Sequence, residues 1–221
     1  MKLLISALTK FLMGLLLVGA MLFWPAGGFD YFNGWLFCAL LFVPMMILDA
    51  VLFVKSPDLL RKRLDSREKE KTQQGVIAWS GLFFFVGFVL AGLDHRFGWS
   101  CVPVWVVAAA SAVLLVSYAL YAEVMRENAY LSRKVEVQEG QQVIDTGLYG
   151  IVRHPMYAVT LWLFLSIPLV LGSWYSLICF ATYPVLIVIR LLNEEKVLTD
   201  ELDGYADYKT RVRYRLIPWI W

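Results

Sequence analysis

Long apolar runs, separated by short polar stretches, make up most of the chain. Four of these runs lie at about 3–24, 31–54, 75–93 and 101–122, and two more lie between 155 and 192. A helix needs about 20 mostly apolar residues to cross the roughly 30 Å of hydrocarbon in a bilayer. Lipid offers no hydrogen bonds to an exposed backbone, so each run should be helical. The pattern predicts an all-α, polytopic membrane helix bundle of about six transmembrane helices.

The last two runs are separated only by Gly172 and Ser173. This spacing predicts a tight C-terminal helical hairpin whose turn lies at the far face of the membrane. The first arm of the hairpin is short, and Pro168 should break it, because proline removes a backbone donor and clashes with the preceding turn. The first run of the chain is too long for a signal peptide and contains Lys10, so we expect a retained membrane anchor.

The basic residues are distributed unevenly among the connections. The segment 55–74 carries seven Lys or Arg residues, whereas 25–30, 94–100 and 172–173 together carry one, Arg96. Lys and Arg near the ends of membrane helices are retained on the cytosolic side. We therefore expect 55–74, the segment after the fourth helix and both termini to be cytosolic.

The composition argues against a soluble globular protein and against a nucleic-acid-binding protein. Hydrophobic residues make up 60% of the chain and charged residues 17%, against about a quarter charged in soluble domains. The net charge is +2, and no basic domain stands apart from the apolar runs, so nothing supports nucleic-acid binding. Cys38, Cys101 and Cys179 lie in or at the edge of separate apolar segments, and His95 and His154 fall on opposite sides of the membrane, so we expect no metal site. The lipid bilayer is the partner that the composition implies.

The chain shows no internal repeat and no low-complexity stretch, which predicts a single integral membrane domain over 1–221. Four transmembrane helices occupy 1–122, and the polar candidates for a site fall within 123–221, together with the helical hairpin and a cytosolic tail. Residues 135–144 alternate around Glu139-Gly140, a pattern typical of a short extended hairpin or an ordered loop. This organisation predicts a pocket at the cytosolic face.

The most informative short motif is Arg153-His154-Pro155-Met156-Tyr157. Pro155 suits the first position of a helix, with His154 held extended before it. A helix start at the membrane surface leaves N–H groups unpaired, and beside Arg153 these form a seat for a carboxylate or phosphate. The alternative from this segment alone is that Arg153 is an interfacial anchor and His154 a helix cap.

A second polar cluster ends the last apolar run. Arg190 and Glu194 are spaced i and i+4, so they share one face of a helix. A charge within an apolar run costs at least ~2.5 kcal/mol on insertion scales, whereas a solvated pair of this spacing gains only about 0.3–0.5 kcal/mol. This imbalance favours a functional site at Arg190. Asp49, near the end of the second run, is an intramembrane acid for which pairing with Lys55 is the simpler interpretation.

The order and spacing of several short motifs resemble those of one known family. The motifs are Gly147-Leu148-Tyr149, Arg153-His154-Pro155-Met156-Tyr157, the cluster at 190–195, and Gly204-Tyr205-x-x-Tyr208 with Arg211-Val212. Between about 138 and 218 the chain is similar to the isoprenylcysteine carboxyl methyltransferase family, in particular its bacterial branch. The resemblance implies an integral membrane S-adenosylmethionine-dependent methyltransferase of the bacterial inner membrane.

The resemblance also implies roles for individual residues. The family binds S-adenosylmethionine at the cytosolic face, and the matching cofactor positions are Gln141, Gln142, Val143, Ile144, Tyr149, His154, Pro155, Met156, Tyr157 and Glu194. Arg190 falls where the family places an arginine on the substrate carboxylate, so Arg190 and Glu194 are the expected catalytic residues. The implied acceptor is lipophilic, a prenylated cysteine or a similar lipid-like molecule. Methyl transfer to a carboxylate is an in-line displacement that needs alignment and exclusion of water but no general base.

Other functions remain open at this point. Phospholipid N-methyltransferases and small-thiol S-methyltransferases use the same methyl donor with a different acceptor. Membrane sterol-type reductases share a related Arg-His-Pro-x-Tyr motif but bind NADPH, whose phosphate-rich tail requires more cations than Arg153 and Arg190 near the pocket. A non-enzymatic membrane scaffold would bind no nucleotide-like ligand and would tolerate the loss of Arg190.

Overall fold

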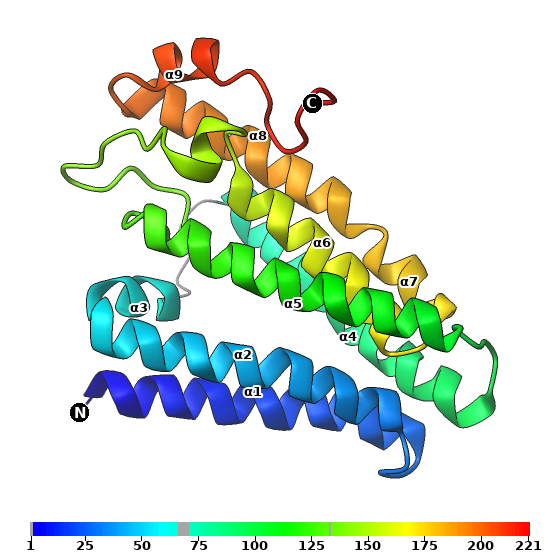
Figure 1. The fold of residues 1–221 in the computed structure, drawn as a ribbon. Coiled ribbons are helices and arrows are strands. Elements are labelled where there is room, and N and C mark those ends of the chain that lie inside the picture. The colour runs from blue at the N-terminus through cyan, green and yellow to red at the C-terminus, as the bar shows by residue number, and fades with distance from the viewer. Residues whose placement is uncertain (1, 66–70, 133) are drawn as a thin grey trace.

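The protein is a bundle of long helices (Figure 1). The computed structural model describes residues 2–65, 71–132 and 134–221, and these residues form helices with no strands. The elements in chain order are α1 (Lys2–Ala26), α2 (Phe32–Lys55), α3 (Pro57–Leu64), α4 (Lys71–Phe97), α5 (Val104–Glu127), η1 (Gly147–Gly150), α6 (Pro155–Val170), α7 (Trp174–Phe180), α8 (Tyr183–Glu201) and α9 (Tyr205–Arg211). The predicted all-α class is confirmed.

Five helical segments within the described residues are long and apolar enough to cross a membrane. They are Leu3–Ala26, Phe32–Lys55, Gln73–Phe97, Val104–Glu127 and Trp174–Glu201. The remaining predicted span corresponds to α6, which is apolar but has only 16 residues. At 1.5 Å per residue α6 is about 24 Å long, less than the thickness of the hydrocarbon layer. The prediction of a polytopic membrane bundle is confirmed, with one span shorter than expected.

The C-terminal helical hairpin turns at Gly172-Ser173, as the sequence predicted. Gly172 has a φ of 76°, and a Cβ there would lie 2.6 Å from Nδ2 of Asn33, so this position requires glycine. The break expected at Pro168 was wrong, because α6 continues through it to Val170. Pro168 lies in the last turn of α6, where the missing N–H removes only one helical hydrogen bond.

The break lies instead in the second arm of the hairpin. Helix α7 ends at Phe180 and α8 starts at Tyr183. Pro184, in the first turn of α8, has no N–H to donate to the carbonyl of Phe180. The second arm is therefore two helices in series, and the angle between them is visible in Figure 1.

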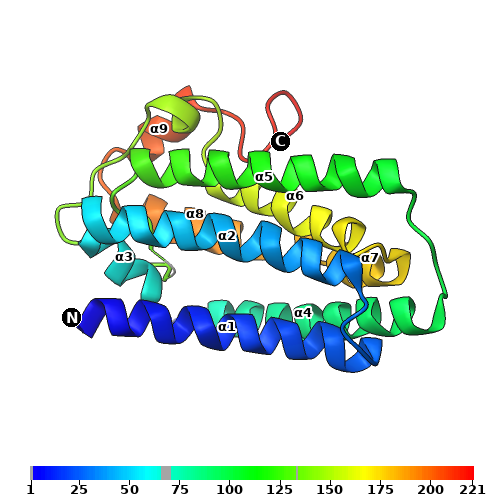
Figure 2. The same ribbon diagram turned by 60° about the horizontal axis from the view of Figure 1, so that its bottom comes forward.

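The two ends of the bundle differ in their connections. Figures 1 and 2 show α3 and α9 at the same end as the start of α1, which we call the site end. The α1–α2 connection and the hairpin turn lie at the opposite end, which we call the turn end. The site end carries the basic segments that predict a cytosolic location, although residues 66–70 of the segment 55–74 lie outside the described residues. The assignment of the site end to the cytosol remains a prediction.

A large cluster of buried apolar side chains lies toward the turn end. The main core cluster includes Leu22, Phe37, Leu114, Ile167 and Phe180, each at most 3% exposed. Leu22, Phe37, Leu114 and Ile167 lie in the turn-end halves of α1, α2, α5 and α6, and Phe180 is the last residue of α7. The site-end half of the bundle is left to hold a cavity.

A buried carboxylate fixes the turn end. Asp94, 2% exposed, accepts hydrogen bonds from the Ser100 backbone N–H at 2.7 Å and from the hydroxyls of Ser100 and Ser173 at 2.5 Å. The Tyr31 hydroxyl donates to the Leu171 carbonyl at 2.5 Å. Asp94 thereby ties the end of α4 to the connection before α5 and to the hairpin turn.

We expect Asp94→Ala to destabilise the protein, because each buried donor left without an acceptor costs about 1–3 kcal/mol. For a chain of this size this corresponds to a fall in Tm of roughly 5 °C or more, measured by tryptophan fluorescence of the detergent-purified protein. Asp30→Ala is the matched control, since the Asp30 side chain is 84% exposed. Equal Tm values for the two variants would contradict a clamping role for Asp94.

Candidate functional site

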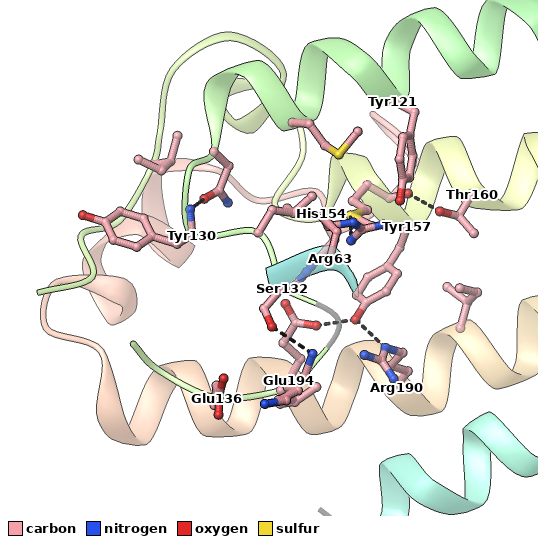
Figure 3. Close-up of a pocket in the computed structure, with 18 of the residues that line it drawn as sticks. Arg63, Tyr121, Tyr130, Ser132, Glu136, His154, Tyr157, Thr160, Arg190 and Glu194 are labelled. Atoms are coloured by element: carbon pink, nitrogen blue, oxygen red, sulfur yellow. Dashed lines mark hydrogen bonds between the residues drawn. The ribbon is translucent and has the colours of Figure 1, made fainter. Parts of the chain in front are cut away.

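A cavity of about 840 Å³ occupies the site-end half of the bundle. Its deeper lining is apolar and includes Phe11 from α1, Leu41 and Met45 from α2, and Leu163 and Phe164 from α6. Its lining nearer the site end is polar and comes from α3, α6, α8, α9 and the loop between α5 and η1. Figure 3 shows part of this cavity with its labelled side chains. One continuous space therefore joins a polar chamber to an apolar one.

A chain of hydrogen bonds crosses the polar chamber (Figure 3). Nε of Arg190 donates to the Tyr157 hydroxyl at 3.0 Å, and that hydroxyl donates to Oε2 of Glu194. The i, i+4 spacing predicted that Arg190 and Glu194 would flank the same volume, and the structure links them through Tyr157 of the neighbouring helix. This arrangement places a cation, a phenol and a carboxylate side by side on the cavity wall.

The adjacent acid, Glu195, lies in a different environment. It is 4% exposed and accepts from Nε of Arg153 at 2.7 Å and from Nε of Arg215 at 2.9 Å. Nε2 of His154 lies 3.3 Å from Oε1 of the same carboxylate. Glu195 therefore joins α8 to the start of α6 and to the C-terminal segment.

Glu195 belongs to the motif at 190–195, but its buried ion network was not predicted from the sequence. The signal that was available is helical spacing, because Ile187, Leu191 and Glu195 recur every four residues and all three are buried. The three positions therefore share the inward face of α8. An acid that continues a buried stripe indicates a paired, buried carboxylate.

The start of α6 also differs from the interpretation drawn from the sequence. Pro155 is the first residue of α6, as predicted, but most backbone donors beside it are occupied. The bonds run from Arg153 N to Tyr214 O (2.8 Å), from His154 N to Arg215 O (2.9 Å), and from Tyr157 N and Ala158 N to His154 O (3.1 Å each). Arg153 is 6% exposed, and its guanidinium is bound to Glu195 and to the carbonyls of the C-terminal segment, at 2.9 Å for Val212 and 2.8 Å for Arg213.

These contacts correct the expectation for Arg153. It is neither an interfacial anchor nor a ligand for an anion at the helix start, because its guanidinium is buried against a carboxylate. His154 is the N-cap residue of α6 through its backbone carbonyl, and its side chain makes no cap hydrogen bond. The Met156 N–H is the donor at this helix start that has no hydrogen-bond partner within the described part of the chain.

The described residues of the segment 128–146 form a loop that lines the cavity. A turn forms at Glu139-Gly140, with Gly140 at a φ of 70°, and no strands form in the part of this loop that the structure describes. The side chain of Gln141 stabilises the turn, since its Oε1 accepts from the Gln138 N–H at 2.9 Å. Val143 packs against the buried cluster around Tyr205 and Tyr208.

Helix α3 contacts this loop from the other side of the cavity. Nζ of Lys134 lies 2.6 Å from Oδ2 of Asp65, and Nζ of Lys62 donates to the Ala129 carbonyl at 3.3 Å. The Arg63 guanidinium lies 5.3 Å from the ring centre of Tyr121, within cation–π range. The mouth of the cavity is thus framed by α3, α5 and the loop.

Tyr149 lies in η1 at the edge of the cavity. Its hydroxyl accepts from Nδ2 of Asn128 at 3.0 Å, and its carbonyl accepts from the Tyr208 hydroxyl at 2.7 Å. Burial raises the pKa of Tyr149 above its ordinary value, so the phenol stays neutral. Gly147 starts η1 with a φ of 52°, and a Cβ there would lie 1.6 Å from Oε1 of Glu127, so only glycine fits.

The structure brings most of the predicted site residues to one cavity. Its lining includes Gln141, Gln142, Val143, Ile144, Tyr149, His154, Met156, Tyr157, Arg190 and Glu194. Pro155 is buried at the start of α6 and is not part of the lining. Asp49, whose role the sequence left open, also lines the cavity, from α2. Arg63 and Tyr121 line it as well, and no motif pointed to them, whereas Tyr205 comes from the motif Gly204-Tyr205-x-x-Tyr208.

The fold and the site define a polytopic helical membrane protein with a mixed polar and apolar cavity at one end of the bundle. The model of the isoprenylcysteine carboxyl methyltransferase (ICMT) family matches residues 105–200. Residues 105–200 are therefore similar to that family, which confirms the resemblance found in the motifs. This segment contains Tyr149, Tyr157, Arg190 and Glu194 but ends before α9.

A relative in Bacillus subtilis (strain 168), the uncharacterized protein YpbQ, is 29% identical over 97 residues. The aligned region covers 43% of this chain and 58% of YpbQ. The chain thus spans little more than half the length of the curated relative that it matches.

We expect Glu195→Gln to destabilise the protein by about 3–5 kcal/mol, because a neutral amide leaves two arginines without their buried counter-charge. The expected readout is a lower Tm in detergent. Glu201→Gln, an exposed position at the end of the same helix, is the matched control and should leave the Tm unchanged. A Glu195→Gln variant as stable as the wild type would show that the network does not hold α6, α8 and the C-terminal segment together.

Proposed function

We propose that this protein is a membrane-embedded, S-adenosylmethionine-dependent methyltransferase that acts on a carboxylate of a lipophilic acceptor. The observation that supports this most directly is the single cavity in which the linked side chains of Arg190, Tyr157 and Glu194 adjoin an apolar chamber. A reaction between a polar cofactor and a lipid-like acceptor requires both environments within contact distance. The family match supplies the reaction class.

The residues of the polar chamber fit the chemistry of S-adenosylmethionine. The cavity volume of about 840 Å³ lies within the usual range for small-molecule and cofactor sites. The Glu194 carboxylate is an acceptor for ribose hydroxyls or the methionyl ammonium, and the Met156 N–H is a donor for the methionyl carboxylate. Tyr149 and Tyr157 offer aromatic rings to a sulfonium cation or to adenine. When bound, the cofactor supplies an electrophilic methyl group.

The loop residues have a complementary role in this proposal. Gln141, Gln142, Val143 and Ile144 line the cavity beside α9. Their backbone and amide groups would contact the adenine end of the cofactor, while Val143 anchors the loop to Tyr205 and Tyr208. His154, held near Glu195, would shape the cavity wall beside Tyr157.

Arg190 would orient the acceptor. A guanidinium binds a carboxylate through parallel hydrogen bonds of defined geometry, which is stronger and more directional than a single contact. An ionised carboxylate already carries the attacking lone pair, so the site has no proton to remove. The contribution of the protein is alignment of acceptor and donor in a chamber sheltered from water.

The apolar chamber would hold the hydrocarbon part of the acceptor. Its walls include Leu41, Met45 and Phe164, and each buried methylene contributes about 0.8 kcal/mol to binding. The alternative NADPH-dependent reductase needs several free cations for phosphates, whereas Arg153 is bound to Glu195 and to backbone carbonyls. The donor-binding experiment below separates the two classes.

We expect calorimetry with the detergent-purified protein to show binding of S-adenosylmethionine and no binding of NADPH. Glu194→Ala should weaken S-adenosylmethionine binding at least about tenfold, the loss of a charge-assisted hydrogen bond. Glu201→Ala is the matched control and should bind as the wild type does. Binding of NADPH alone would assign the protein to the reductases, and binding of neither ligand would contradict the proposal.

A second experiment identifies the accepting group. Transfer of radiolabelled methyl is measured to N-acetyl-S-farnesyl-L-cysteine, a long-chain fatty acid, phosphatidylethanolamine and a small thiol. We expect the labelled methyl group to be transferred to the acids. Base should then release it from the resulting esters as methanol. Arg190→Ala should reduce this transfer by about 100-fold or more while donor affinity stays within twofold, since Arg190 contacts the acceptor. Transfer to the amine or the thiol alone would replace the carboxylate with that acceptor.

A further inference from the structure

A glutamine far from the family motifs contacts Arg190. Gln73 lies in the first turn of α4, and its side chain is completely buried, at 0% exposure. Its Oε1 accepts from a terminal nitrogen of Arg190 at 2.9 Å, and its Nε2 donates to the Arg190 carbonyl at 3.4 Å. Gln73 precedes the segment 105–200 that matches the family, and it does not line the cavity.

Two neighbours on different helices thus hold the guanidinium of Arg190. Tyr157 on α6 accepts from Nε, and Gln73 on α4 accepts from a terminal nitrogen. The guanidinium is planar, so two contacts at separate nitrogens fix the orientation of that plane. An arginine side chain otherwise samples many rotamers, and ordering it during binding would weaken the binding of a ligand.

The simpler alternative is that Gln73 is a satisfied buried amide that joins α4 to α8. A buried amide needs a hydrogen-bond partner, and the Arg190 carbonyl alone would provide one. The bond to the guanidinium is not needed for that purpose. It brings a neutral acceptor to the side chain of Arg190, which lines the cavity. Because Gln73 is neutral, it orients the guanidinium without adding a counter-charge of its own.

We propose that Gln73 is a positioning residue for the methyl acceptor, acting through Arg190. It holds the guanidinium in the plane and direction in which it meets the carboxylate of the acceptor. This inference rests on the proposed function. It predicts that loss of the Gln73 amide impairs use of the acceptor and leaves binding of the methyl donor intact.

The test compares Gln73→Met, which keeps the side-chain length without its hydrogen bonds, with Gln74→Met at the exposed neighbouring position. Methyl transfer to N-acetyl-S-farnesyl-L-cysteine is measured with saturating S-adenosylmethionine. We expect Gln73→Met to lower kcat/KM for the acceptor by 10- to 100-fold, with the donor Kd within twofold. In an Arg190→Lys background the same substitution should have little further effect, because residues that act as one unit are not additive.

A charged variant gives a second, independent readout. Gln73→Glu keeps an accepting oxygen but adds a negative charge beside Arg190, which would compete with an acidic acceptor. We expect its acceptor KM to rise at least tenfold while the donor Kd is unchanged. This variant also decides the question if Gln73→Met fails to fold.

The outcomes are distinguishable. Wild-type turnover in both Gln73 variants, or loss of donor binding together with turnover, overturns the positioning role and leaves the proposed function standing. A wild-type protein that binds S-adenosylmethionine but methylates no acid also overturns it, because there is then no carboxylate to position. A wild-type protein that binds no donor overturns the proposed function and this inference together.

Discussion

The structure depends on how charge is neutralised inside a bundle of apolar helices. A charge carried into hydrocarbon is costly unless it meets a partner, and an ion pair that loses one member is costlier still. Glu195 meets this constraint by pairing with Arg153 and Arg215, and the main chain of Arg153 and His154 bonds to the C-terminal segment. The start of α6 is therefore fixed from two sides, and with it the position of Tyr157 in the cavity.

The same constraint divides the bundle along its length. At the turn end, Asp94 accepts hydrogen bonds from hydroxyl and backbone groups, and Phe37 and Leu114 belong to a buried apolar core. At the site end, charged side chains such as Arg190 and Glu194 line a cavity instead. In the proposed function, the closed end would hold the relative positions of the helices while the cavity binds and releases its ligands. The short helix α6 runs between these two regions and contributes to both.

The sequence predicted the spans and the hairpin because apolar length and glycine conformation are local properties. It also predicted that Arg190 and Glu194 share a face, since helical spacing alone determines this. It failed at Pro168, because the effect of a proline depends on how near the helix end lies. It failed for Arg153 and Gln73 because their partners lie on other elements, and pairing between distant segments leaves no local periodicity.

Two neighbouring acids on α8 show how the buried network and the site are coupled. Side chains of consecutive residues in a helix point about 100° apart. The side chain of Glu195 therefore points to the ion network, while that of Glu194 points to the cavity. Because Glu195 is held by two arginines, the rotation of α8 about its axis is fixed. This rotation sets the directions of Glu194 and, one turn earlier, of Arg190. The buried ion network around Glu195 thus determines which side chains of α8 the cavity presents.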